Sequence, residues 1–151
     1  PQTGVQVYAS LPENISSLGG FATSSDARGE LLRQYLSRYE SPLVPYADYI
    51  VQKSDEYGID FRLPVAIARQ ESALCKFIPQ STYNCWGWGI HSKGTLGFET
   101  WEAGIETVVK GLKQDYIDKV LVTPEEIMTK YTPLSEGSWA TAVNFFISEM
   151  E

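Results

Sequence analysis

The sequence predicts a mostly α-helical fold, a helical bundle with one irregular or small β lobe. Apolar residues recur at helical spacing in six segments, helix caps border several of them, and no section is rich in strand patterns. A chain of 151 residues has the size of one domain. We therefore expect a single folded domain over residues 26–151, preceded by an irregular arm or linker over residues 1–25, which is rich in Gly, Ser, Thr and Pro.

Three helices are expected in the first half of the chain. The first begins near Asp26, with Ser25 or Asp26 as its N-cap, and carries a helical stripe of Leu and Tyr. The second covers residues 46–57, because Gly58 suits a left-handed C-terminal cap. The third begins after Asp60, a good N-cap. It tolerates Pro64, since the first helical turn has no internal hydrogen bond to lose.

The second half combines a long loop with three more helices. Between Cys75 and Thr100, Pro and Gly interrupt every periodic pattern, so we expect a loop region that can hold a short hairpin. Thr100 is the expected cap of a helix over residues 101–116. Thr123, a proline and a carboxylate three residues on form a capping box for a short helix. The last helix should begin near Ser138.

Composition excludes several classes of function. The net charge of −7 argues against nucleic acid, and no apolar run is long enough for a membrane anchor. A metal site is not expected because His91 is the only histidine, and we expect no cofactor. The separation of Cys75 and Cys85 suits a disulfide that closes the loop between them, although two reduced thiols stay an alternative.

Glu71 is the main candidate for catalysis. It continues the apolar helical stripe of Leu63, Ile67 and Leu74, where burial raises the pKa of a carboxyl group. A carboxyl that stays protonated near neutral pH can act as a general acid. The alternative is a structural ion pair between Glu71 and Arg69 or Lys76.

An aromatic, glycine-rich loop follows the Glu71 helix. Tyr83, Trp86 and Trp88 offer flat faces on which sugar rings stack, and glycines at 87 and 89 allow close approach of the backbone. An acid beside such a loop suits glycosidic cleavage. The alternatives are that the tryptophans are core residues and that Ser72 only bonds the preceding turn.

Four segments resemble the lysozyme-like superfamily. The string Ile67-Ala68-Arg69-Gln70-Glu71-Ser72 resembles the catalytic helix of soluble lytic transglycosylases and bacterial endo-β-N-acetylglucosaminidases of the mannosyl-glycoprotein endo-β-N-acetylglucosaminidase type. Residues 84–91, 98–101 and 130–133 are similar to later glucosaminidase motifs, so the resemblance covers approximately residues 45–151. Trp88 and Trp101 replace the usual Phe and Tyr, and Glu99 stands where the family often has Arg. Gly87-Trp88-Gly89-Ile90 replaces the Gly-Leu-Met-Gln signature of the transglycosylases, which favours the glucosaminidases.

The resemblance implies that residues 26–151 form a lysozyme-like catalytic domain. Its expected activity is cleavage of β-1,4 links between N-acetylglucosamine and N-acetylmuramic acid in peptidoglycan, with Glu71 and Tyr131 catalytic. The expected substrate-binding residues are Ser72, Tyr83, Trp86, Trp88, Gly89, Ile90 and Trp101. We expect a monomer, extracellular or in the cell envelope, whose leader is not part of this sequence.

The sequence leaves open the second catalytic group, the reaction type and the class of protein. Hydrolysis usually needs a second carboxylate, but no motif singles out Glu99, Glu102, Glu106 or Glu136. A residue of the irregular lobe or the substrate's own N-acetyl group could take that role. Without either, a transglycosylase would form an anhydro sugar. Two other hypotheses are a non-catalytic glycan-binding module and a helical interaction domain with buried Trp86 and Trp88.

Overall fold

A computed structural model describes residues 24–79, 81–89 and 97–151. Within these ranges the chain is all-α, with no strand. The described part of the lobe between Cys75 and Thr100 is therefore irregular and contains no β-hairpin. Two short 3-10 helices, η1 (Val44–Tyr46) and η2 (Ile117–Lys119), supplement the α-helices. The six α-helices are α1 (Ser24–Arg38), α2 (Ala47–Tyr57), α3 (Arg62–Ser72), α4 (Trp101–Asp115), α5 (Pro124–Tyr131) and α6 (Ser138–Ser148). The predicted arm lies almost wholly outside the described residues, as do Ile90 and His91.

Local sequence signals set most helix ends. Gly58 ends α2 in the left-handed conformation with φ 73°, and the Thr100 hydroxyl caps α4 by accepting from the Ala103 N–H at 3.0 Å. The capping box between Thr123 and Glu126 begins α5. The Asp60 prediction was wrong by one residue, because a turn puts Phe61 at the N-cap. The Asp60 carboxylate still accepts from the Arg62 N–H at 2.9 Å.

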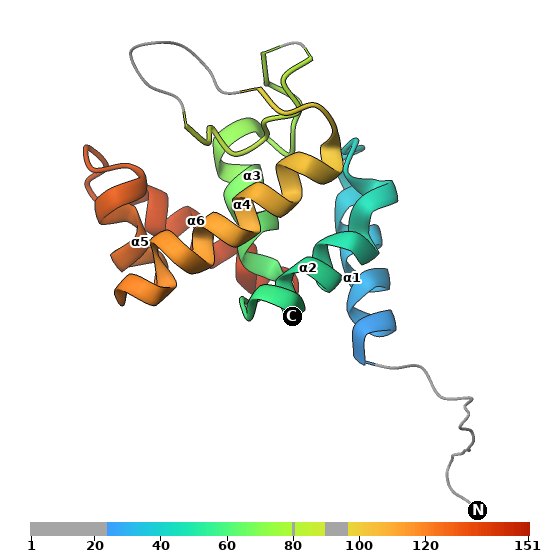
Figure 1. The fold of residues 1–151 in the computed structure, drawn as a ribbon, viewed down its shortest axis with the longest axis horizontal. Helices are drawn as coiled ribbons and strands as arrows, with labels where there is room; N and C mark the ends of the chain where they lie inside the picture. The colour runs from blue at the N-terminus through green and yellow to red at the C-terminus, as the bar shows by residue number, and fades with distance from the viewer. Residues whose placement is uncertain (1–23, 80, 90–96) are drawn as a thin grey trace, which may run out of the picture.

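The central helix of the bundle is α3. Figure 1 shows it between the α1–α2 pair and the α5–α6 pair, with α4 crossing in front and the described parts of the loop between α3 and α4 at one end. It packs on α6, while α2 packs on α1 and α4. Its apolar face is buried as the periodicity predicted, with Leu63 and Ile67 in the core. Leu74 is buried as well, but it lies beyond the helix end at Ser72. None of the helices in the described ranges has the length and apolarity to cross a membrane.

Candidate active site

Glu71 lies half-buried in the last turn of α3. Its Oε2 accepts a hydrogen bond from the indole N–H of Trp139, a residue of α6, over 2.7 Å. Burial raises the pKa of Glu71, and the Trp139 hydrogen bond opposes that rise by favouring the carboxylate. The predicted raised pKa is therefore present, and it has the predicted cause.

Arg69 is not the partner of Glu71. It points to the other side of α3, where it donates to the Tyr35 hydroxyl and the Glu149 carboxylate. Its guanidinium also stacks 4.4 Å from the ring centre of Tyr39 and 4.1 Å from that of Phe146. Lys76 is exposed and forms no ion pair with Glu71 among the described residues. The Arg69 alternative was thus wrong.

The backbone turns sharply after α3. Three consecutive residues other than glycine adopt left-handed angles, with φ 52° at Ala73, 58° at Leu74 and 76° at Cys75. Residues with a Cβ atom disfavour positive φ, so contacts with the surrounding structure must hold the backbone in this turn. One contact is the predicted disulfide between Cys75 and Cys85, which is formed. It joins the end of the Glu71 helix to the aromatic loop.

Ser72 is the second tie between α3 and the aromatic loop. It is 5% exposed, and its Oγ accepts from the Cys75 N–H at 2.8 Å. Its single hydroxyl hydrogen can donate to the Cys85 carbonyl at 2.7 Å or to that of Ala68 at 3.1 Å. The structure thus places Ser72 under the loop, where it holds the backbone instead of facing a ligand.

The two loop tryptophans have different positions. Trp86 is 1% exposed and donates from its indole N–H to the Pro64 carbonyl at 2.9 Å, so it belongs to the core and does not line a groove. Trp88 is partly exposed. Asn84 holds it, since its Oδ1 accepts from the Trp88 N–H at 3.0 Å and its amide donates to the Trp88 carbonyl at 2.8 Å.

Tyr131 connects Glu71 to Trp88. Its ring stacks on Trp139 with centres 5.3 Å apart and lies 6.0 Å from the ring of Trp88. Its hydroxyl donates to the Trp86 carbonyl. Burial raises the pKa of Tyr131 well above the ordinary value, and the Glu71 and Tyr116 charges add to this effect. The phenol therefore stays neutral, and the aromatic cluster of Trp88, Tyr116, Tyr131 and Trp139 reaches from the surface to Glu71.

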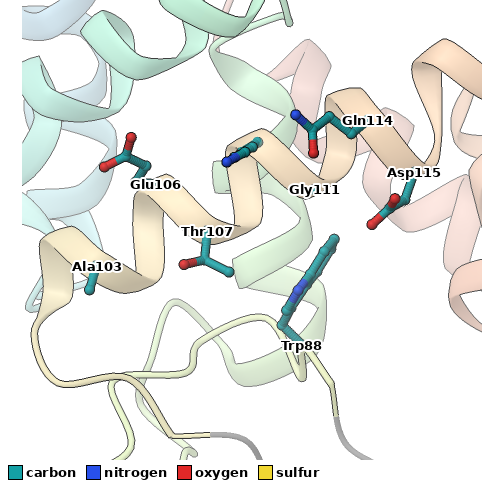
Figure 2. Close-up of a pocket in the computed structure, with 8 residues that line it drawn as sticks. Trp88, Ala103, Glu106, Thr107, Gly111, Gln114 and Asp115 are labelled. Carbon is teal, nitrogen blue, oxygen red and sulfur yellow. The ribbon is translucent and has the colours of Figure 1, made fainter.

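Two hollows share Trp88 as a lining residue. The α4 groove has a volume of about 470 Å³, and Figure 2 shows Trp88 rising toward α4 with Thr107 on one side and Asp115 on the other. The Tyr131 hollow has a volume of about 230 Å³. The α4 groove is lined by Trp88, Ala103, Glu106, Thr107, Lys110, Gly111, Gln114 and Asp115. The Tyr131 hollow is lined by Gly87, Trp88, Gly89, Asp115, Tyr116, Lys130 and Tyr131.

Other predicted binding residues are placed differently. Gly89 lines the Tyr131 hollow, as expected for a glycine that lets the backbone approach a ligand. Tyr83 and Trp101 form an edge-to-face pair with centres 4.9 Å apart at 77°, both partly buried at the start of α4. Neither lines the two hollows. Ile90 lies outside the described residues.

Several residues of the site were not predicted from the sequence. Trp139 is buried in the core, and its hydrogen bond to Glu71 gives it a further role. The signal available was that a buried indole N–H needs an acceptor. Asn84, Asp115 and Lys130 were not singled out, because polar residues in loops and at helix ends carry no periodic pattern.

No protein-family model matches the chain, and no curated protein matches its sequence.

Proposed function

We propose that this protein is a lysozyme-like glycosidase that cleaves β-1,4 links of peptidoglycan between N-acetylglucosamine and N-acetylmuramic acid. The observation that carries the proposal is the setting of Glu71. A half-buried carboxyl group with a raised pKa lies at the inner end of an aromatic cluster whose outer member, Trp88, lines two open hollows. Glu71 lines neither hollow itself and is linked to their Trp88 wall through Trp139 and Tyr131. A carboxyl group with a raised pKa near an aromatic binding surface suits proton donation to a glycosidic oxygen.

The groove chemistry supports a saccharide ligand. Sugar rings offer C–H faces to an indole and hydroxyl groups to polar side chains. Beside Trp88, the hollows present the Thr107 hydroxyl, the Gln114 amide and the Asp115 carboxylate, which can exchange hydrogen bonds with sugar hydroxyls. Trp88 borders both hollows, so one glycan strand can extend across its ring.

The resemblance of residues 45–151 to lysozyme-like enzymes supports the same reaction. The disulfide between Cys75 and Cys85 supports an oxidising location, extracellular or in the cell envelope, because disulfides persist there. Glu71 would protonate the leaving oxygen as the glycosidic bond breaks. It would then accept a proton from the attacking hydroxyl, which belongs to water in a hydrolase or to the sugar's C6 in a transglycosylase.

The test is digestion of purified peptidoglycan by wild type, Glu71→Gln and Glu102→Gln. Glutamine keeps the shape of Glu71 and an oxygen for Trp139 but cannot donate a carboxylic proton, so cleavage should fall at least a thousandfold, roughly the loss of a general acid together with its positioning. Glu102 is exposed on α4, and its variant should cleave like wild type. Full turnover by Glu71→Gln would refute the proposal, as would glycan binding by wild type without cleavage.

Mass spectrometry of the products separates the two reactions. An anhydro product lacks one water relative to a hydrolysed product, and the sugar at the new end identifies the bond that was cut. Hydrolysed ends on N-acetylglucosamine would assign a glucosaminidase, and anhydro ends on N-acetylmuramic acid would assign a lytic transglycosylase.

A further inference from the structure

We propose that Trp139 is a positioning residue that fixes which oxygen of Glu71 carries the catalytic proton. The indole is held on two sides, since its N–H reaches Oε2 of Glu71 at 2.7 Å and its face stacks on Tyr131 at an interplanar angle of 28°. Only 3% of Trp139 is exposed, and its backbone N–H donates to the Ser135 hydroxyl at 3.2 Å. The N–H direction is therefore fixed by packing. This inference rests on the proposed function, because it concerns how Glu71 donates its proton.

The chemistry of an indole N–H makes the assignment specific. This group can donate a hydrogen bond but can neither accept one nor carry charge at ordinary pH. The oxygen that faces Trp139 therefore acts as an acceptor in both protonation states. Because the carbonyl oxygen of a carboxylic acid accepts more strongly than its hydroxyl oxygen, the short Trp139 bond favours the carbonyl form at Oε2 and the proton on the other oxygen, Oε1.

This arrangement defines both proton transfers. In the first, the O–H bond at Oε1 breaks and the leaving glycosidic oxygen takes the proton, while Oε2 keeps its hydrogen bond. In the second, Oε1 accepts the proton of the attacking hydroxyl, which restores the acid. The carboxyl group does not rotate between the steps, so the acid and base positions coincide on one atom.

The other titratable and charged groups near Glu71 form no hydrogen bond with its carboxyl group among the described residues. From α5 the facing group is Tyr131, which is neutral and gives its hydroxyl hydrogen to the Trp86 carbonyl. Tyr116, after α4, faces Tyr131. Arg69 on α3 and Glu149 beyond α6 bind each other on the opposite side of α3. Among the described residues, the Trp139 N–H is thus the polar contact that acts directly on the Glu71 carboxyl.

The experiment compares Trp139→Phe with Val143→Ala. Phenylalanine keeps a ring for Tyr131 but removes the N–H donor. Val143 is fully buried one turn further along α6, so its variant loosens the same helix and leaves the donor in place. For each folded variant, the Glu71 carboxyl is titrated by ¹³C NMR in the free protein. The pH dependence of kcat and KM is then measured on a soluble peptidoglycan oligosaccharide.

Trp139→Phe should raise the pKa of Glu71, because the lost hydrogen bond favoured the carboxylate. The alkaline limb of the kcat profile should move to higher pH, and kcat at the optimum should fall about tenfold with little change in KM. Val143→Ala should lower Tm and leave both the titration and the pH profile unchanged. The inference is overturned if Trp139→Phe titrates like wild type, or if Val143→Ala moves the titration equally. Neither result depends on turnover, whereas full cleavage by Glu71→Gln would refute the proposed function alone.

Discussion

Gly111→Ala is expected to displace Trp88 from the α4 groove. Gly111 is buried in α4 against the indole, and an added Cβ would lie 2.2 Å from Cζ2 and 2.8 Å from Cη2 of Trp88. Ordinary contact begins at 3.4 Å, so the ring must retreat by about 1.2 Å, the difference between 3.4 and 2.2 Å. The backbone of Trp88 cannot follow freely, because Asn84 binds both its N–H and its carbonyl.

Two effects on the free energy of unfolding oppose each other in Gly111→Ala. Replacing a glycine by alanine inside a helix stabilises it by up to about 1 kcal/mol, whereas overpacking costs about 1–3 kcal/mol. Gly111→Ala should therefore lower the free energy of unfolding by about 0–2 kcal/mol. A displaced Trp88 loses its stacking on a sugar. With the value for an aromatic pair, about 0.5–1.5 kcal/mol, oligosaccharide affinity should fall about 2- to 13-fold.

Gly29→Ala is the matched control for this prediction. Gly29 lies inside α1, and its added Cβ would meet the carboxylate end of the exposed Asp48 side chain, which can rotate away. This variant should gain helix stability and bind oligosaccharide like wild type. Urea unfolding measures stability, and a tryptophan-fluorescence titration measures affinity. If both alanine variants are equally stable and bind equally well, Gly111→Ala does not displace Trp88 from a sugar-binding position.

Three further predictions concern stability. Glu71→Gln should raise Tm at pH 7 but not at pH 4. Because folding raises the pKa of Glu71 above its ordinary value of 4.5, wild type loses stability as the pH rises from 4.5 through the pKa of the folded protein, whereas the glutamine variant does not. Thermal melts that differ equally at both pH values would contradict this. Replacing Cys75 and Cys85 by Ser should lower the free energy of unfolding by about 2.7 kcal/mol for a loop of 10 residues, measured in urea against wild type under non-reducing conditions. Thr123→Ala should cost about 1 kcal/mol in the same assay and leave cleavage unchanged, since it removes only the α5 cap; a loss of cleavage would speak against this separation.

Local signals predicted the helices well. Capping residues such as Gly58, Thr100 and Thr123 act within one turn of the chain, so the sequence contains the whole interaction. The stripe that carries Glu71 was likewise visible, because helical periodicity depends only on residues in one segment. Asp60 shows the limit of such signals, since a turn at Phe61 moved the helix start by one residue.

The functions of individual side chains were harder to predict, because they depend on contacts distant in sequence. Trp86 and Trp88 are two residues apart in the same aromatic pattern. Trp86 nevertheless lies in the core under Pro64, and Trp88 borders the grooves. Trp139 is 68 positions from the carboxylate it binds. Periodicity shows that a residue is buried, but it cannot show which partner the residue meets there.

The contacts around Glu71 form a closed circuit, which makes its members interdependent. Ser72 binds the loop at the Cys85 carbonyl, and the next residue of the loop, Trp86, accepts from the Tyr131 hydroxyl. The Tyr131 ring stacks on Trp139, whose N–H returns to Glu71 beside Ser72. A change in any member alters the position of the others, so substitution effects around the circuit should not add. Because three chain segments and one disulfide meet there, the geometry of the carboxyl group is a property of the whole fold, although the residue itself was identifiable from one helical stripe.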